Sequence, residues 1–208
     1  MTRIRDIVVA ALMLLVLSPF LLILVALIRL DSPGPALYRQ VRVGLNGKPF
    51  RIHKLRSMRT GAVGLSVTTG DDPRVTRSGR WLRAAKLDEL PQLIDVLLGA
   101  MSLVGPRPEV PRYVDLWPPD LRPVILSVRP GITDPATVLL RSEGEILAHS
   151  PDPERTYVEE LLPLKAQAYV SYVRSRSFVG DIKIMLATFK AIIHPAPNAR
   201  LPKDLETR

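Results

Sequence analysis

The chain has 208 residues, 47% hydrophobic and 24% charged, which suffices for one sizeable core and is typical of neither a disordered nor a collagenous chain. It contains no cysteine, so disulfides, thiolate metal sites and a cysteine nucleophile are excluded. The net charge of +9 is uneven: residues 1–60 carry ten Lys or Arg and two acids, whereas the remainder is almost balanced.

An uninterrupted apolar run near the N-terminus predicts a membrane segment. Residues 7–28 include no charged side chain, and a helix of this length would reach roughly 33 Å, about the hydrocarbon thickness of a bilayer. Basic residues stand on both sides, with Arg3 and Arg5 before the run and eight Lys or Arg between residues 29 and 59 after it. Because basic flanks favour the cytoplasmic side, both ends favour the same side.

Ser18 and Pro19 stand in the middle of this run. Proline removes a backbone donor and clashes with the carbonyl four residues back, so a sharp bend is expected there. A re-entrant helix-break-helix hairpin would satisfy both the basic flanks and the proline. A kinked helix that spans the bilayer fits the same residues, because membrane helices tolerate proline. A cleaved signal peptide fits less well, since the run is long and lacks a clear small-residue cleavage site.

Beyond the run, the pattern predicts a small β-hairpin followed mainly by helices. Residues 36–43 and 49–54 have the composition of short strands around Asn46-Gly47. The eight prolines of residues 102–135 predict extended or looped chain. Helical spacing occurs in residues 81–85, 87–98, 154–175 and 178–193. The last of these helices is amphipathic, and its apolar face fits either the protein core or the membrane interface.

Asp88 and Glu89 form an acidic pair at the expected start of a helix. Pro91 fits a first turn, because its missing N–H would have had no intrahelical partner there. The positive end of the helix dipole would help to keep Asp88 ionised. Leucine and isoleucine fill the buried face of this helix, so the acids are expected to stay accessible. Two interpretations remain open, a capped helix whose acids only match the dipole, and a catalytic pair.

Four arginines are candidates for phosphate binding, because a guanidinium donates two parallel hydrogen bonds to phosphate oxygens. Arg107 and Arg129 stand in proline-bracketed turns, and Arg83 and Arg141 complete the set. Each of them alone also fits a surface charge or the structural partner of an acid. The sequence has no phosphate-binding loop, dinucleotide fingerprint, zinc-protease motif or nucleophile elbow, and its three histidines lack metal-site spacing.

Four motifs follow one another in the chain: Asp72-Pro-Arg-Val-Thr-Arg77, Leu87-Asp-Glu-Leu-Pro-Gln92, Met101-Ser-Leu-Val-Gly-Pro-Arg-Pro108 and Arg129-Pro-Gly-Ile-Thr133. Taken in order, they resemble those of the bacterial sugar transferases called small monotopic phosphoglycosyl transferases. The resemblance covers roughly residues 1–193. It implies a monotopic membrane protein with a re-entrant hairpin broken at a Ser-Pro pair, here Ser18 and Pro19. The resemblance therefore favours the hairpin over the spanning helix.

The resemblance implies transfer of a sugar 1-phosphate from a UDP-sugar to polyprenyl (undecaprenyl) phosphate, which releases UMP and starts glycan assembly. Asp88 would be the nucleophile, forming a phosphosugar-aspartyl intermediate, and the ligand of Mg²⁺. Glu89 would assist proton removal from the lipid phosphate or position it. Arg83 would lie near the polyprenyl phosphate, Arg107 near the nucleotide-sugar, and Arg141 would clamp a phosphate.

We therefore expect an α+β, mostly helical fold in three parts. These are a re-entrant hairpin at residues 1–30, a catalytic domain at residues 31–195 on the cytoplasmic face of the bacterial inner membrane, and a flexible tail at residues 196–208. Longer relatives carry spanning helices ahead of the catalytic part, and we expect the minimal form. Expected partners are a UDP-sugar, polyprenyl phosphate and membrane lipids. Lys86 and Asp134-Pro135 depart from the family pattern and leave the sugar undetermined.

A second hypothesis is a non-catalytic, membrane-anchored basic protein that binds acidic lipid or nucleic acid through residues 29–60. Its basis is the net charge of +8 in residues 1–60. The eleven aromatic residues are scattered, however, and the sequence has no stacking platform or nucleic-acid motif. We therefore expect no nucleic-acid partner, and turnover of UDP-sugars would separate the two hypotheses.

Overall fold

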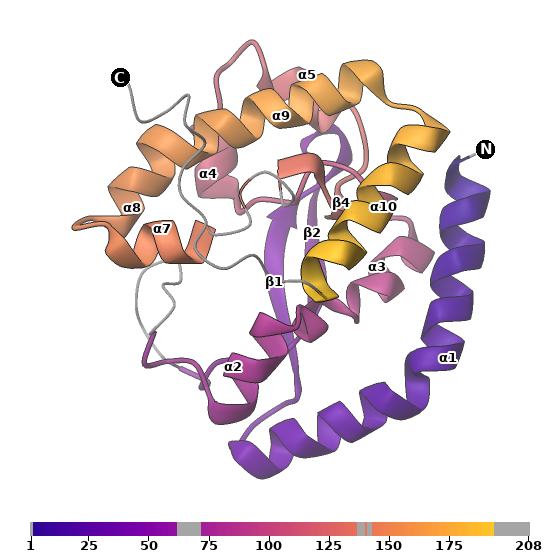
Figure 1. Cartoon of the computed structure of the whole chain (residues 1–208), viewed down its shortest axis with the longest axis vertical. Coiled ribbons are helices and arrows are strands. Elements are labelled where there is room, and N and C mark those ends of the chain that lie inside the picture. Colours follow the sequence, from indigo (N-terminus) through magenta and orange to yellow (C-terminus); the bar gives the residue numbers. More distant parts are fainter. Residues whose placement is uncertain (1, 62–71, 137–139, 141–142, 194–208) are drawn as a thin grey trace.

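A bent apolar helix borders one side of the molecule, and shorter helices surround two small sheets (Figure 1). The computed structural model describes residues 2–61, 72–136, 140 and 143–193. Over these residues the predicted α+β, mostly helical fold is confirmed. The tail expected at residues 196–208 lies outside the described residues.

The apolar run forms α1 (Thr2–Asp31), which remains helical through Pro19. In Figure 1 the first half of α1 descends along the body and the second half turns beneath it, so the predicted break is a bend in a continuous helix. Pro19 cannot donate to the carbonyl of Leu15, and the Ser18 hydroxyl donates to that carbonyl at 2.9 Å. The Ser-Pro pair thus permits the bend without leaving this acceptor unsatisfied.

Most of α1 is exposed. Only 11% of its apolar window is buried in the protein, unlike the core helix of a soluble fold. The large exposed side chains include Leu15, Val16, Leu22 and Leu30. Such a surface is far more apolar than water-exposed helices usually are, which supports the prediction of a membrane segment.

The predicted hairpin is confirmed. Strand β1 (Leu37–Val43) pairs antiparallel with β2 (Pro49–Leu55), and the short helix η1 (Leu45–Gly47) joins them. Asn46 and Gly47 have φ values of 54° and 75°, a left-handed conformation that these two residue types adopt most readily. Their sequence therefore fixes the place of the turn and the register of both strands.

The middle of the chain alternates short helices with a second sheet. Helix α2 (Arg77–Ala84) is followed by η2 (Leu87–Glu89) and α3 (Gln92–Leu98). Strands β3 (Ser102–Val104) and β4 (Gly131–Thr133) then pair in parallel. The connection between them holds α4 (Pro111–Asp115) and α5 (Arg122–Leu126), where the sequence predicted mostly loops. Both helices have proline in their first turn, where proline is compatible with helix formation.

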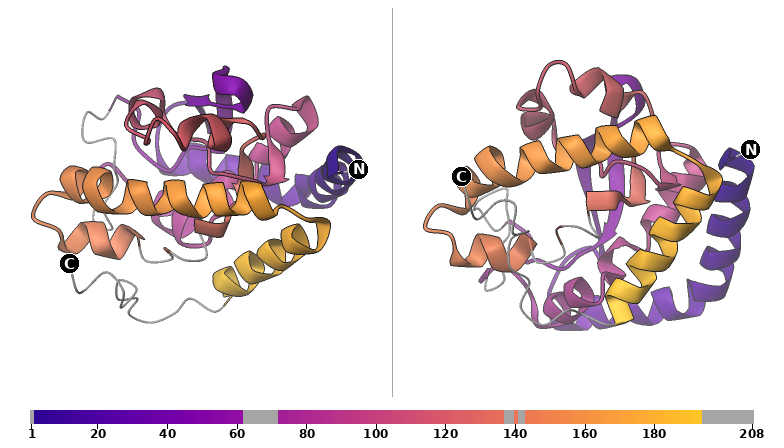
Figure 2. Two further views of the ribbon diagram at one scale, coloured as in Figure 1. Left: turned by 90° about the horizontal axis from the view of Figure 1, so that it is seen from above. Right: turned by 45° about the horizontal axis from the view of Figure 1, so that its top comes forward.

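Helices complete the fold. They are α7 (Glu143–His149), α8 (Pro153–Thr156), the π-helical turn η3 (Tyr157–Leu161), α9 (Leu162–Ser175) and α10 (Phe178–Ile193). The last two predicted helices are thus confirmed. Figure 2 shows α9 crossing the body and α10 turning back from its end. Helix α10 packs Ile184 and Met185 against the core but leaves Leu186 and Phe189 exposed, so it has apolar residues on both faces.

Three apolar clusters hold these elements together. The largest lies around Trp117 and Tyr169, between α4, α5 and α9. A second joins the first half of α1 to β2, α3 and β3, and a third packs Leu24 and Ile28 of the second half of α1 against Leu82 of α2. The short segment η2 lies between α2 and α3 and packs against β2, so its position depends on all three.

Candidate active site

Asp88 and Glu89 lie in the short 3-10 segment η2, just before α3, whereas the sequence predicted them at the start of the helix itself. The backbone N–H groups of Glu89 and Leu90 donate to the carbonyls of Lys86 and Leu87, three residues earlier, which is the hydrogen-bond pattern of a 3-10 helix. Helix α3 begins only after Pro91. Both side chains are buried, with 7% and 8% of their residues' surfaces exposed. The prediction that the acids stay accessible is therefore wrong, because β2 packs against η2 and the Arg107 side chain reaches Glu89.

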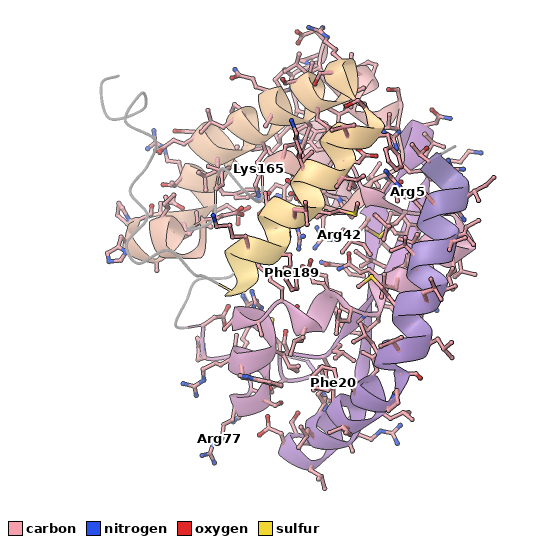
Figure 3. The ribbon with its side chains drawn as sticks, turned by 45° about the vertical axis from the view of Figure 1, so that its right-hand side comes forward. Arg5, Phe20, Arg42, Arg77, Lys165 and Phe189 are labelled. Atoms are coloured by element: carbon pink, nitrogen blue, oxygen red, sulfur yellow. The ribbon has the colours of Figure 1, made fainter. Side chains whose placement is uncertain are left out.

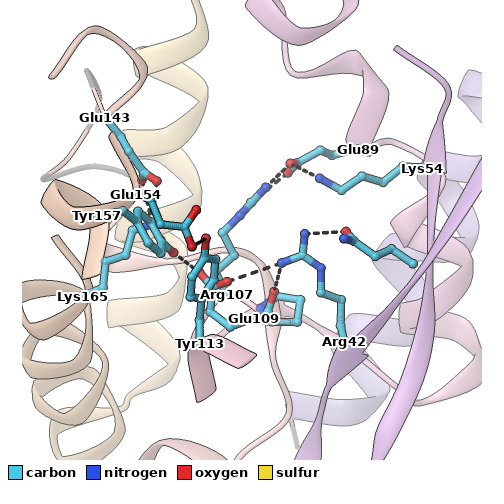
Figure 4. A network of polar contacts seen from close by, with 12 residues as sticks. Arg42, Lys54, Glu89, Arg107, Glu109, Tyr113, Glu143, Glu154, Tyr157 and Lys165 are labelled. Atoms are coloured by element: carbon cyan, nitrogen blue, oxygen red, sulfur yellow. Dashed lines mark hydrogen bonds and ion pairs between the residues drawn. The ribbon is translucent and has the colours of Figure 1, made fainter. Parts of the chain in front are cut away.

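Glu89 is held by two cations from different parts of the chain (Figure 4). The Lys54 ammonium, from β2, donates to its Oε1 at 2.9 Å. The Arg107 guanidinium, from the turn after β3, donates to both oxygens, with 3.0 Å between Nη1 and Oε2. Burial alone would raise the pKa of Glu89, but the charges of Arg107 and then Lys54 hold it well below its ordinary value. Glu89 is therefore a fixed anion.

Asp88 has the opposite environment. Among the residues that the structure describes, none forms a hydrogen bond or ion pair with its carboxylate. Burial and then the adjacent charge of Glu89 raise the pKa of Asp88, against the opposing charges of Lys54, Arg83 and Arg107. The expected lowering by the helix dipole does not prevail, because η2 precedes the helix and desolvation is the larger effect. Asp88 is thus a carboxylate with cations nearby but no fixed partner.

The parallel sheet explains the position of Arg107. A Cβ atom on Gly105 would lie 2.5 Å from the carbonyl oxygen of Arg129, and one on Gly131 would lie 2.1 Å from the Gly105 nitrogen. Glycine is therefore required at both positions for the two motif segments to approach this closely. Because β3 ends in this contact, the turn that follows directs Arg107 toward Glu89.

Two cations of this cluster, Lys54 and Arg42, were not singled out from the sequence, although both lie in the basic stretch of residues 29–60. Their position depends on how the hairpin meets α3. The Asp95 carboxylate of α3 accepts from the backbone and from the ring Nδ1 of His53, at 2.8 and 2.7 Å. This contact fixes β2 against α3 and brings the next residue, Lys54, to Glu89.

The four predicted phosphate-binding arginines are not all together. Arg83 lies on α2, close enough for its charge to oppose the rise in the pKa of Asp88. Arg107 contacts Glu89 directly. Arg129 lies at the other end of α3, where its Nε donates to the carbonyl of Gly99 at 2.9 Å. Arg3 donates to two further carbonyls there. Arg141 lies outside the described residues.

The acid pair could hold a magnesium ion only together with phosphate oxygens of the substrate. The described part of the chain holds no group of three or more His, Asp or Glu side chains that could bind a metal. Mg²⁺, however, is commonly held by one or two carboxylates together with substrate phosphates. Asp88 has a carboxylate free for this purpose, whereas both oxygens of Glu89 are already engaged by cations.

A family model described as "Bacterial sugar transferase" matches residues 1–195. The chain belongs to the bacterial sugar transferase family. This membership confirms the family and the enzyme class, a transferase, that the motifs predicted.

Named relatives of this bacterial sugar transferase are similar over most of its length. The chain is 41% identical over 196 residues to a "UDP-glucose:undecaprenyl-phosphate glucose-1-phosphate transferase" from Caulobacter vibrioides, covering 92% of the chain and 69% of that protein. It is 38% identical over 200 residues to a protein of the same name from Escherichia coli, covering 93% of the chain and 40% of that protein. A "UDP-N-acetylgalactosamine-undecaprenyl-phosphate N-acetylgalactosaminephosphotransferase" from Aeromonas hydrophila is 34% identical over 192 residues, covering 90% of the chain and 42% of that protein.

Proposed function

We propose that this protein transfers a sugar 1-phosphate from a UDP-sugar to polyprenyl phosphate and releases UMP. The observation that carries the proposal is the contrast within the acid pair, in which Glu89 is engaged by Lys54 and Arg107 while Asp88 has no hydrogen-bond or ion-pair partner in the described part of the chain. A carboxylate that is free but surrounded by cations is suited to attack an anionic diphosphate. The names of the relatives in three bacteria support the same donors and acceptor class.

The reaction would proceed in two displacements at one phosphorus atom. An Asp88 oxygen forms a bond to the phosphorus next to the sugar, the bond from that phosphorus to the bridging oxygen breaks, and its electron pair leaves with UMP. An oxygen of the polyprenyl phosphate then attacks the same phosphorus. The bond to Asp88 breaks, the carboxylate is regenerated, and a polyprenyl diphosphate sugar is released.

The neighbouring residues would bind and orient rather than exchange protons. Glu89 has its pKa held so low that it is a poor proton acceptor, and we assign it the role of positioning Lys54 and Arg107 at the diphosphate. Arg83, in the last turn of α2, is near enough for its charge to act on Asp88 and would bind the polyprenyl phosphate. Mg²⁺ held by Asp88 and substrate phosphates would neutralise phosphate charge.

We further propose that α1 enters the cytoplasmic leaflet and returns, so that the catalytic part lies on the cytoplasmic face of the inner membrane. Both ends of α1 contact the same folded body, which supports this arrangement. Arg3 donates to carbonyls of α3, and Asp31 accepts from the backbone and hydroxyl of Ser78 at 2.9 and 2.8 Å. In Figure 3, Phe20 of the second half of α1 points toward the body.

The test is to trap the covalent intermediate. Purified protein incubated with a UDP-sugar and Mg²⁺, without lipid acceptor, should gain the mass of a sugar phosphate and release UMP, and a chelator should prevent both. Asp88→Asn should abolish the mass gain and reduce turnover by at least a thousandfold, because an amide is not a nucleophile. Asp115→Asn changes an exposed carboxylate and is the matched control. Unmodified protein accumulating product, or an active Asp88→Asn variant, would reject the covalent scheme.

A further inference from the structure

Arg42 is a cation of the site that has a buried donor without a partner among the described residues. It lies on β1, with Phe50 as its cross-strand neighbour, and its guanidinium points into the body beside Arg107 and Glu109 (Figures 3 and 4). Arg39 is three residues earlier on the same strand and has the opposite orientation, with an exposed side chain. The alternation of the strand therefore places one arginine inside and one in solvent.

The partners of Arg42 are mostly neutral. Its Nη1 donates to the carbonyl of Pro108 at 3.0 Å, and its Nη2 donates to the amide oxygen of Gln40 at 2.8 Å. The carboxylate of Glu109 is 3.5 Å away, and its other oxygen accepts a 2.6 Å hydrogen bond from Tyr157. The Nε of Arg42 is buried without a partner among the described residues.

The Arg42 side chain is 18% exposed, and a guanidinium at this depth with one long ion pair and one buried, unpaired donor is unusual, because buried polar atoms are normally paired. Lys54 and Arg107 lie close enough to Arg42 to raise the positive potential around it. The single carboxylate of Glu89 pairs with both Lys54 and Arg107. Burial and then the charge of Arg107 lower the pKa of Arg42, against the opposing charge of Glu109. The site is therefore suited to a further anion next to Arg42.

The geometry points to Arg42 as a ligand of the phosphate that leaves with the nucleotide. This inference rests on the proposed function. Attacking and leaving oxygens are roughly in line in phosphoryl transfer, so the leaving nucleotide lies on the far side of the attacked phosphorus from Asp88. Lys54, Arg83 and Arg107 are the cations whose charges act on Asp88. Arg42 instead contacts Pro108 and Glu109, the two residues that follow Arg107 in the turn after β3. Arg42 would stabilise the charge that develops on the departing nucleoside monophosphate.

The inference predicts that Arg42 matters in only one half of the reaction. Arg42→Gln should weaken UMP binding, measured by calorimetry on the full-length protein, at least tenfold. It should slow formation of the phosphosugar-enzyme by a similar factor. Transfer from the isolated phosphosugar-enzyme to polyprenyl phosphate should change less than twofold, since the nucleotide has already left. Arg42→Lys should be intermediate, because an ammonium keeps the charge but not the planar fork.

Arg39→Gln removes the same charge from the outer face of β1 and is the matched control, with less than a twofold change in each measurement. Equal slowing of both half-reactions in Arg42→Gln, as a general structural defect would cause, would overturn the inference. Unchanged UMP affinity in an active Arg42→Gln protein would also overturn it, while leaving the transferase proposal intact. Conversely, UMP binding that depends on Arg42 in a protein that never forms the covalent adduct would reject the proposed reaction and retain the anion site.

Discussion

Two adjacent carboxylates have opposite electrostatic environments in this site. Glu89 and Asp88 are both buried, but only Glu89 receives hydrogen bonds from Arg107 and Lys54. Burial and then the fixed charge of Glu89 raise the pKa of Asp88, whereas the charges of Arg107 and then Lys54 hold the pKa of Glu89 below its ordinary value. A difference in environment, rather than in residue type, thus separates the proposed nucleophile from its neighbour.

The position of Arg129 leads to a prediction that differs from the one made for it as a substrate ligand. Its side chain is exposed and donates to the carbonyl of Gly99, which caps the C-terminus of α3, where a cation complements the helix dipole. Arg129→Gln should lower the free energy of unfolding by about 1 kcal/mol or less and leave the KM for the UDP-sugar within twofold. Arg107→Gln, measured in parallel, should lower kcat/KM at least tenfold. A large rise in KM for Arg129→Gln would instead support substrate binding by this residue.

Among the elements, α9 and the preceding turn η3 contain three buried tyrosines, from which we predict that the fold is sensitive to alkali. Tyr157 donates to Glu109 at 2.6 Å and Tyr172 donates to Asp181 at 2.8 Å, while Tyr169 is fully buried. Burial is the largest cause that raises the pKa of each of these hydroxyls in the folded protein.

A raised pKa means that the folded state retains protons that the unfolded state loses above pH of about 10. The stability contributed by these tyrosines should therefore be complete below that pH and decline as pH rises further. Tyrosinate absorbance and circular dichroism, followed together, should change in one transition above pH 10. Tyr172→Phe should reduce the slope of stability against pH in that range. Ionisation of the buried tyrosines in a protein that keeps its native circular dichroism would contradict the prediction.

Local patterns predicted elements better than they predicted the site. The hairpin at Asn46-Gly47 and the helix of residues 178–193 follow from turn chemistry and apolar spacing, which act over a few residues. The start of α3 was misplaced because Pro91 allows a helix to begin either before or after it. Arg42 and Lys54 could not be assigned, because their role depends on long-range contacts such as that between His53 and Asp95.

At the scale of the whole molecule, the body holds the apolar helix at both ends. At its start, Arg5 pairs with Asp181 of α10 at 2.8 Å, and the buried Asp6 accepts from Ser102 of β3. At its end, the buried Arg56 donates to carbonyls of Ile28 and Pro33. Arg3 and Arg5, which the sequence offers as basic flanks of a membrane segment, therefore also bind within the protein. The contacts of both helix ends with one folded body favour the proposed arrangement, in which both ends lie on the same side of the bilayer.

This constraint gives a prediction of topology. Because the natural sequence has no cysteine, single cysteines introduce the only thiol. Thr2→Cys and Leu45→Cys should both react with a charged maleimide in inverted inner-membrane vesicles and not in intact spheroplasts. Val16→Cys is the matched control, since Val16 is 74% exposed in the protein and, in the proposed arrangement, is shielded by lipid. It should react in detergent-free membranes only after denaturation. Labelling of Thr2→Cys and Leu45→Cys from opposite sides would require a spanning helix, and ready labelling of Val16→Cys would place α1 outside the bilayer.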